Sequence, residues 1–171
     1  GWAWDFDDGN VANVQNPIHS YANDGVYNAS LTVTSNNGCE NDSTLVVTVH
    51  PKPDASFSGV ELSGCAPICP VVTSTSVVNA PSNIVNYEWR LSDGTVVDGA
   101  NPVFADCFDN ETGNSIFYGL ELEVTTNEGC KDVHNEANYI EVFHNPIASF
   151  FYSPEKPDVI DPVVTYTNTS N

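Results

Sequence analysis

Basic residues are scarce in this chain. Its 171 residues include only 4 Lys and Arg against 23 Asp and Glu, which gives a formal net charge of −19. Nucleic acids and anionic lipid surfaces bind proteins mainly through clusters of basic side chains. A chain this acidic cannot supply such clusters, so the composition excludes nucleic-acid binding and electrostatic attachment to a membrane.

Long apolar runs are absent as well. No stretch approaches the roughly 18 consecutive apolar residues that a membrane-spanning helix needs, so the sequence predicts no direct membrane insertion. The first residues, 1–9, have neither the basic start nor the apolar core of a secretion signal. Because the chain begins with Gly1 rather than Met, this absence carries no information about export.

Residues that favour helices are few, and Met is missing altogether. Val, Thr and Tyr are frequent instead, and 11 Gly and 11 Pro are scattered among many Asn, Asp and Ser residues. That mixture is typical of short strands joined by tight turns. Since only 16% of residues are charged and 40% are hydrophobic, we expect a folded all-β protein rather than a disordered acidic tail.

An internal repeat organises the chain, with segments that return after 85 to 93 residues. Such self-similarity is the sequence signature of repeat architectures. It predicts three units: an incomplete repeat over 1–52, a complete repeat over 53–145 and the opening strands of a third over 146–171. The matching pairs are Trp2–Gly9 with Tyr87–Gly94, Tyr27–Val33 with Tyr118–Val124, and Pro53–Phe57 with Pro146–Phe150.

The repeated segments alternate between apolar and polar residues with the period of a half-buried strand. Asp-Gly and Asn-Gly pairs follow them as hairpin signals, so the pattern predicts a series of antiparallel hairpins. Short strands over a repeat of about 90 residues favour tandem immunoglobulin-like β-sandwiches. The predicted core residues are Trp4, Trp89, Tyr27 and Tyr118.

Five spaced elements in residues 4–39 resemble the signature of the PKD (polycystic kidney disease) domain. The chain departs from the signature at Asp7, where the family normally has Gly, and more in Trp89–Gly94 and in an enlarged segment over 106–115, which has lost the His-x-Tyr element. The elements are Trp4-Asp5-Phe6-Asp7-Asp8-Gly9, Asn16-Pro17-Ile18-His19-Ser20-Tyr21, Gly25-Val26-Tyr27, Leu31-Thr32-Val33-Thr34 and Asn37-Gly38-Cys39.

The resemblance implies a non-catalytic, extracellular module at the cell surface. Tandem PKD domains form arrays in large surface and secreted proteins of Bacteroidetes, gliding adhesins among them, so we expect an extended stalk that is a slice of a longer array. The rival hypothesis is an accessory polysaccharide- or protein-binding or spacer module of a secreted hydrolase. Expected partners are neighbouring repeats of the same polypeptide, surface polysaccharide or other cell-surface proteins. An aromatic row on one sheet face would favour polysaccharide binding, and a polar face a spacer.

The five cysteines give a prediction of disulfides. Cys39 and Cys130 occupy the same position in the first and second repeats. Cys65 lies before the second strand of the complete repeat, in a part that the first repeat lacks, which predicts a Cys65–Cys130 bond. Cys69 and Cys107 are then a second candidate pair, and Cys39 is left unpaired. Zinc bound by Cys65 and Cys69 with His134 or His144, and free thiols, are the alternatives.

The acidic turn after the first strand is a weak calcium candidate, with Asp5, Asp7, Asp8 and Asn10 as oxygen ligands. Because the second repeat keeps only Asp93 of these positions, turn formation is the stronger interpretation. No nucleophile elbow, metalloprotease motif or phosphate-binding loop accompanies the histidines. We therefore expect no enzymatic activity and no required cofactor.

Overall fold

The computed structural model describes residues 1–153, 155 and 163–170, and within this part the chain is entirely β. The strands are β1 (Trp2–Asp5), β2 (Val11–Ala12), β3 (Gly25–Thr34), β4 (Glu40–Val49), β5 (Phe57–Val60), β6 (Ser63–Cys65), β7 (Val71–Ser74), β8 (Ile84–Leu91), β9 (Val96–Gly99), β10 (Val103–Ala105), β11 (Ile116–Thr126), β12 (Lys131–Phe143), β13 (Phe150–Ser153) and β14 (Thr165–Asn168).

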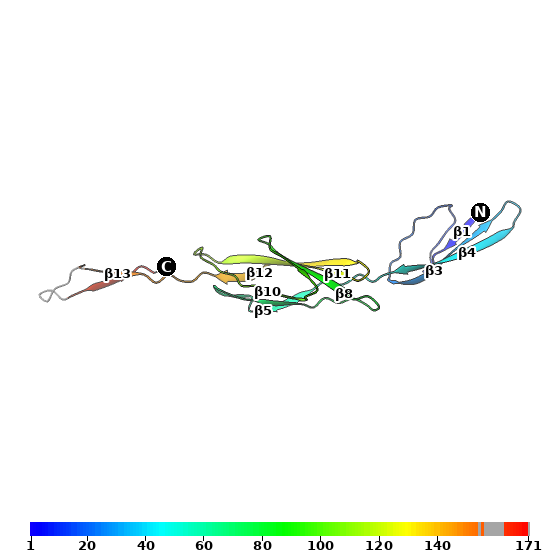
Figure 1. Ribbon diagram of the computed structural model, residues 1–171. Helices are drawn as coiled ribbons and strands as arrows, with labels where there is room; N and C mark the ends of the chain where they lie inside the picture. The colour runs from blue at the N-terminus through cyan, green and yellow to red at the C-terminus, as the bar shows by residue number, and fades with distance from the viewer. Residues whose placement is uncertain (154, 156–162, 171) are drawn as a thin grey trace.

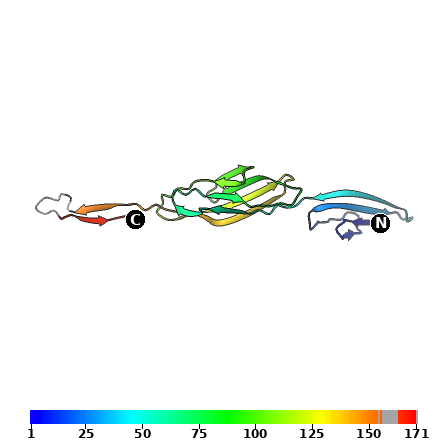
Figure 2. The same ribbon diagram turned by 90° about the horizontal axis from the view of Figure 1, so that it is seen from below.

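The strands form three units that follow one another end to end (Figures 1 and 2). The N-terminal sheet has the order β2-β1-β3-β4, and the C-terminal hairpin pairs β13 with β14. Between them, the middle sandwich contains the sheets β10-β7-β5 and β6-β12-β11-β8-β9. Extensive contacts between strands are confined to strands of the same unit.

The N-terminal sheet is built around the long hairpin of β3 and β4. The two strands pair from Gly25 opposite Val49 to Thr34 opposite Glu40. The turn between them includes Gly38, whose φ of 79° lies in the left-handed region that glycine adopts without a steric cost. The Asn-Gly signal therefore marks the hairpin that the sequence predicts.

The middle sandwich encloses the hydrophobic core. Its two sheets form two layers, with β8, β11 and β12 in one and β5 and β10 in the other (Figure 1). Apolar residues at alternate positions of each strand point between the layers, as the period of two requires. The most buried members are Val72, Trp89, Phe104, Leu120, Leu122, Val124, Ile140 and Val142.

One strand pairing departs from the expected antiparallel hairpins. β6 runs parallel to the end of β12, with Ser63 opposite Glu141 and Cys65 opposite Phe143. Backbone hydrogen bonds at both ends of β6 hold this register. Glu141 N donates to Leu62 O (2.8 Å), and Ala66 N donates to Phe143 O (3.0 Å). A non-local pairing of this kind leaves no turn signal in the sequence.

The N-terminal sheet and the larger sheet of the middle sandwich share one strand order. The order β2-β1-β3-β4 corresponds to β9-β8-β11-β12, and matched strands contain the matched repeat segments. The prediction of an all-β, immunoglobulin-like fold is confirmed. The slice of a longer array stays a prediction, and residues 154, 156–162 and 171 of the predicted third unit lie outside the described residues.

The joint between the N-terminal sheet and the middle sandwich is anchored on Asp132. Pro51 and Pro53 are buried there, and the Lys52 ammonium pairs with Asp132 Oδ1. Asp132 Oδ2 accepts a hydrogen bond from Ala55 N (2.9 Å). The Ala55 N–H and then Lys52 lower the pKa of Asp132, so its carboxylate is charged in the folded protein.

We expect the Asp132→Ala variant to lose about 1–3 kcal/mol of unfolding free energy at pH 7, because a buried backbone N–H loses its acceptor. Chemical denaturation measures this. Since the folded pKa lies below the ordinary 3.8, the carboxylate's contribution is present above pH 3.8 and is lost as the pH falls through the folded pKa. The difference in unfolding free energy between Asp132→Ala and wild type should therefore shrink as the pH falls below 3.8. Lys52→Ala, which removes only an exposed ion pair, is the control and should cost less. Equal stability of Asp132→Ala and wild type at pH 7 would contradict this role.

Candidate functional site

The acidic turn after β1 is held by its own carboxylates. Asp5 Oδ1 accepts a hydrogen bond from Asp7 N (2.9 Å), and Asp8 Oδ1 accepts one from Asn10 N (3.1 Å). Both are contacts of an Asp side chain with the backbone two residues on, which is how Asp stabilises turns. Gly9 completes the turn at a φ of 88°.

Asp7 occupies the position where the PKD signature has Gly. Its φ of 64° is left-handed, which explains why Gly suits this position. The carboxylate adds a contact that Gly cannot make, because Asp7 Oδ2 accepts hydrogen bonds from Asn28 N (2.7 Å) and Asn28 Nδ2 (3.2 Å). Asp7 therefore ties the turn to β3.

Asp8 contacts the histidine of the signature. Its Oδ2 lies 2.8 Å from His19 Nε2, and the His19 ring stacks on Phe6 at 4.1 Å and meets the edge of Tyr21 at 4.7 Å. Desolvation raises the pKa of Asp8, but hydrogen bonds from Asn10 and His19 outweigh it, so the pKa is lowered overall. This cluster packs the turn against the loop between β2 and β3.

These contacts favour turn formation over calcium binding at Asp5, Asp7, Asp8 and Asn10. Each of the three carboxylates already accepts a hydrogen bond within the protein. Among the described residues, no group of three or more His, Cys, Asp or Glu side chains is arranged to hold a metal ion.

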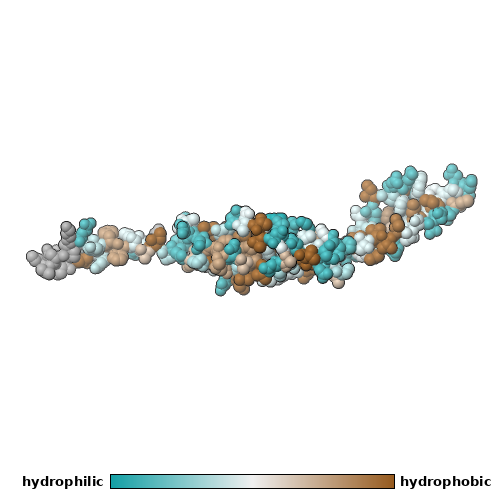
Figure 3. All heavy atoms as spheres, in the orientation of Figure 1, coloured by the Kyte–Doolittle hydropathy of each residue, from teal (hydrophilic) through white to brown (hydrophobic). Residues whose placement is uncertain are grey.

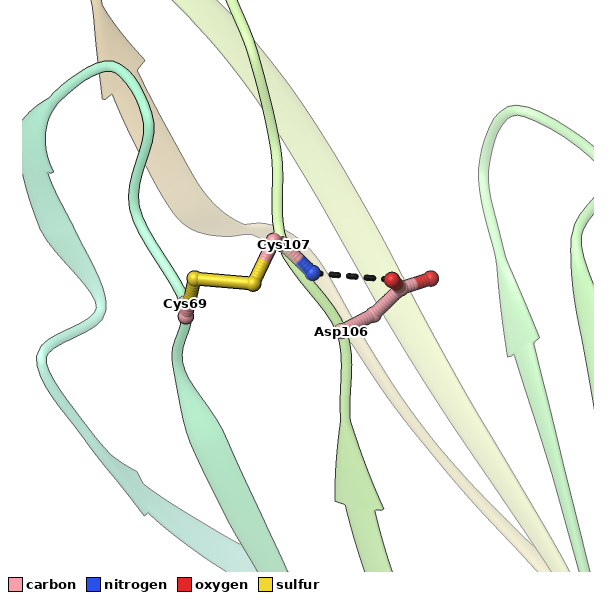
Figure 4. The surroundings of a disulfide bond; sticks show 3 residues. All are labelled: Cys69, Asp106 and Cys107. Atoms are coloured by element: carbon pink, nitrogen blue, oxygen red, sulfur yellow. Dashed lines mark hydrogen bonds between the residues drawn. A yellow bond between two sulfur atoms is a disulfide. The ribbon is translucent and has the colours of Figure 1, made fainter.

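The disulfide between Cys69 and Cys107 confirms one of the two predicted pairs (Figure 4). It joins the segment before β7 to the segment after β10, and the neighbouring Ile68 and Phe108 exchange two backbone hydrogen bonds of 3.1 and 2.8 Å. Cys107 N also donates to Asp106 Oδ1 at 2.8 Å. The bond therefore fastens the enlarged segment 106–115 to the smaller sheet.

The predicted Cys65–Cys130 disulfide is wrong, since both residues are free thiols. Cys65 pairs with Phe143 at the end of β12, whereas Cys130 precedes the start of that strand. The 13 residues of β12 rise about 3.3 Å each, which separates the two cysteines by about 40 Å. The zinc alternative fails as well, because Cys69 is already in a disulfide.

The four predicted core residues have different environments. Trp89 is 1% exposed and packs between Phe57 and Phe104, with ring centroids 5.5 and 6.0 Å away. Tyr118 is half-buried against Phe108 at 4.6 Å. In the N-terminal sheet, Trp4 and Tyr27 are half-buried; the Trp4 indole donates to Val14 O, and the Tyr27 hydroxyl donates to Asn23 O.

The outer face of the larger sheet is charged. Arg90 lies among three carboxylates, with nitrogen-to-oxygen distances of 2.7 Å to Glu88, 2.8 Å to Glu121 and 3.7 Å to Glu123. Hydrogen bonding to Arg90 lowers the pKa of Glu121, and Lys131 pairs with Glu123 on the same face. The sequence signal for this cluster is the alternation of Glu121 and Glu123 with buried Leu120 and Leu122, which the repeat pattern alone does not reveal.

We expect Arg90→Met to lower the melting temperature at low ionic strength, because three carboxylates on neighbouring strands lose their shared cation. The difference from wild type should shrink in high salt, which screens surface charges. Calorimetry at two salt concentrations measures both effects. Lys52→Met, which removes one cation that pairs with Asp132 rather than with these carboxylates, is the charge-matched control. A salt-independent loss would contradict the electrostatic explanation.

Comparison with known proteins gives one family match. Residues 1–49 match the model described as PKD domain. Among solved structures, the fibronectin(III)-like modules of Clostridium thermocellum CbhA have 13% identity and a TM-score of 0.40, with 84% of this chain and 77% of that chain covered. The amphioxus IgVJ-C2 molecule has 16% identity and a TM-score of 0.40, with 81% and 87% covered.

PKD domains are immunoglobulin-like, usually extracellular and typically non-catalytic structural or binding modules. In the part of the chain that the structure describes, no helix is long and apolar enough to cross a membrane. The signature elements in residues 4–39 lie inside the matched range, and in the structure they form the acidic turn, the His19 cluster and the β3–β4 hairpin. The resemblance to the PKD domain is therefore confirmed by the family match over residues 1–49.

Proposed function

We propose that this chain is a non-catalytic segment of an extended, acidic stalk in a large extracellular adhesin at a bacterial cell surface. The observation that carries the proposal is the end-to-end arrangement of its units (Figures 1 and 2). A stalk needs units that resist folding back on one another, and the joints and charge of this chain meet that need.

Charge supports the extended arrangement. Within 53–145 there are 14 Asp and Glu against Arg90 and Lys131, a balance of 2 − 14 = −12. Like-charged units repel within a Debye length of about 10 Å at 0.1 M salt. The buried prolines 51 and 53 and the Lys52–Asp132 pair restrict the first joint, and Asn145 Nδ2 donates to Ala66 O (2.6 Å) at the second.

The outer faces of the middle sandwich favour a spacer over a polysaccharide-binding module. Stacking on sugar rings requires a row of exposed aromatic side chains. The outer face of the larger sheet has the Arg90 cluster and two exposed aromatic side chains, Phe117 and Phe143, at one end, which do not extend into a row along the sheet. The outer face of the smaller sheet has Ser58, Val60, Val71 and Thr73. An accessory module of a secreted hydrolase is thus the second candidate.

Small-angle scattering tests the stalk proposal. Proteins with one, two and three linked copies of residues 53–145 should show a maximum dimension that grows almost linearly with copy number, at both 50 and 500 mM salt (about 14 and 4 Å Debye length). Repeats packed side by side at both salt concentrations would overturn the proposal. Saturable binding of a soluble polysaccharide by the single repeat would instead favour the accessory module.

A further inference from the structure

The outer face of the larger sheet has a hollow of about 320 Å³. Gly119 of β11 forms its floor, between Ser92, which directly follows β8, and Ala137 of β12. The hollow lies away from both ends of the chain, on the two-sheet sandwich whose core is closed. Figure 3 shows separate hydrophobic patches among hydrophilic residues on the visible face of this sandwich, a surface better suited to a small amphipathic ligand than to broad apolar docking.

The first repeat has larger side chains at the corresponding place. A Cβ on Gly119 would lie 3.6 Å from Ala137 Cα and 3.7 Å from Ser92 Cβ, so these three positions adjoin. All three are smaller than their repeat equivalents: Ser92 for Asp7, Gly119 for Asn28 and Ala137 for Val46.

The hollow does not interrupt the hydrogen bonding of the sheet. In the first repeat Asp7 Oδ2 accepts hydrogen bonds from both Asn28 N and Asn28 Nδ2. In the middle repeat Ser92 Oγ still accepts one from Gly119 N (3.0 Å). The backbone contact is therefore retained, while the side-chain volume that fills the first repeat is missing.

One side of the hollow is polar and consists of Arg90, Glu121 and Asn135. Glu121 accepts hydrogen bonds from Arg90 Nη1 (2.8 Å) and Asn135 Nδ2 (3.2 Å), so the three side chains orient one another. A guanidinium has five N–H donors and a carboxylate has about four acceptor sites, so both keep capacity for a ligand. This polar side thus presents oriented donors and acceptors while Arg90 and Glu121 neutralise each other.

Phe117 borders the opposite side of the hollow. Tyr118 and Leu120 pack into the core, so Phe117, Gly119 and Glu121 point outward from the same strand. Phe117 is 49% exposed, and two residues of a strand place it about 7 Å from Gly119. An apolar ring therefore faces the polar side across the floor.

This combination matches a single sugar ring, which has C–H groups on its faces and hydroxyl groups around its rim. The volume is at the lower end of the range of about 300–1,000 Å³ that is usual for ligand pockets. Phe117 and the polar side close the hollow in both directions along β11, which suits a terminal sugar unit and not the interior of a chain. Glu88 and Glu123 next to Arg90 oppose an anionic sugar.

We propose that this hollow binds one uncharged terminal sugar unit of a glycan. Its hydroxyl groups bond to the polar side, and its ring packs toward Phe117. An open hollow that contacts about a dozen non-hydrogen atoms of a ligand gives a Kd of about 1–10 mM. This inference adds a recognition site to the proposed stalk and does not depend on it, because binding and extension are measured separately.

An NMR titration of the isotope-labelled chain tests the site. The probes are the methyl glycosides of glucose, galactose, mannose and N-acetylglucosamine, each added up to about 100 mM, well above the expected Kd. At least one of them should give saturable shifts confined to amides in 90–92, 117–121 and 135–137. Glucuronic acid, which is anionic, should not bind. A soluble polysaccharide has few chain ends and should not give saturable binding.

Three variants locate the ligand. Ala137→Val restores the size of the first-repeat residue and should weaken binding at least tenfold. Asn135→Ala removes one member of the polar side and should weaken it at least threefold. Ala105→Val, the same substitution as Ala137→Val on a strand of the smaller sheet, is the matched control and should change the Kd less than twofold. All three residues are exposed, so the spectra should show a folded sandwich.

Four results would overturn the proposal. The first is that no neutral glycoside gives saturable shifts at the hollow. The second is that Ala137→Val binds as wild type does, and the third is that glucuronic acid binds as tightly as the neutral sugars. The fourth is a soluble polysaccharide that binds more tightly than the methyl glycosides, which would show an extended groove and support the accessory module instead.

Discussion

Replacing Trp89 by alanine is expected to lower the unfolding free energy of the middle sandwich by about 3–5 kcal/mol, the usual cost of truncating a buried large aromatic residue. Trp89 is 1% exposed and contacts aromatic rings of the opposite sheet, Phe57 at 5.5 Å and Phe104 at 6.0 Å. Alanine would leave a cavity between the two sheets. Urea denaturation followed by circular dichroism measures the loss.

The repeat supplies the control for this prediction. Trp4 is the equivalent of Trp89, but it is only half-buried on the open face of the N-terminal sheet. We expect Trp4→Ala to leave the unfolding of the middle sandwich unchanged. Equal destabilisation of the middle sandwich by Trp4→Ala and Trp89→Ala would contradict the assignment of the core to residues 55–142.

Removing the disulfide is expected to cost about 2–4 kcal/mol, since an intact bond between residues 38 apart restricts the unfolded chain. The Cys69→Ala/Cys107→Ala double variant should therefore melt well below wild type under non-reducing conditions. Cys65→Ala/Cys130→Ala is the matched control and should melt within a degree or two of wild type, because those two thiols are free.

Peptide mapping of a non-reduced digest checks the bond itself. The expected product joins the peptides that contain Cys69 and Cys107. A peptide pair that joins Cys65 to Cys130 would contradict the structure, in which β12 separates these residues.

Local patterns in the sequence predict much of the fold. A strand is correctly indicated by the alternation at Trp2, Trp4 and Phe6, and a hairpin by the Asn37-Gly38 pair. Both signals are reliable because the two-residue period of a strand and the residue preferences of a tight turn depend only on neighbouring residues. The internal repeat adds the equivalence of Trp4 and Trp89, which the shared strand order supports.

What the sequence could not predict depends on residues far apart in the chain. The Cys65–Cys130 pairing failed because repeat position gives no distance, and the parallel alignment of β6 with β12 separates the two thiols. The role of Asp132 leaves no local signal, because it depends on a hydrogen bond from Ala55 N across 77 residues. The acidic turn was interpreted more accurately, since Asp5 and Asp8 contact residues only two positions away.

Residual dipolar couplings test most directly whether the units form one extended, stiff body. The sample is the chain at a concentration at which sedimentation velocity shows a single monomeric species, so that tumbling reflects one molecule. With the joint held by Pro51, Pro53 and the Lys52–Asp132 pair, amides of residues 2–49 and 57–143 should fit one alignment tensor with the relative orientation seen in Figure 1. Two tensors of different magnitude, with couplings of the N-terminal sheet averaged toward zero, would show a freely bending joint and contradict the stalk.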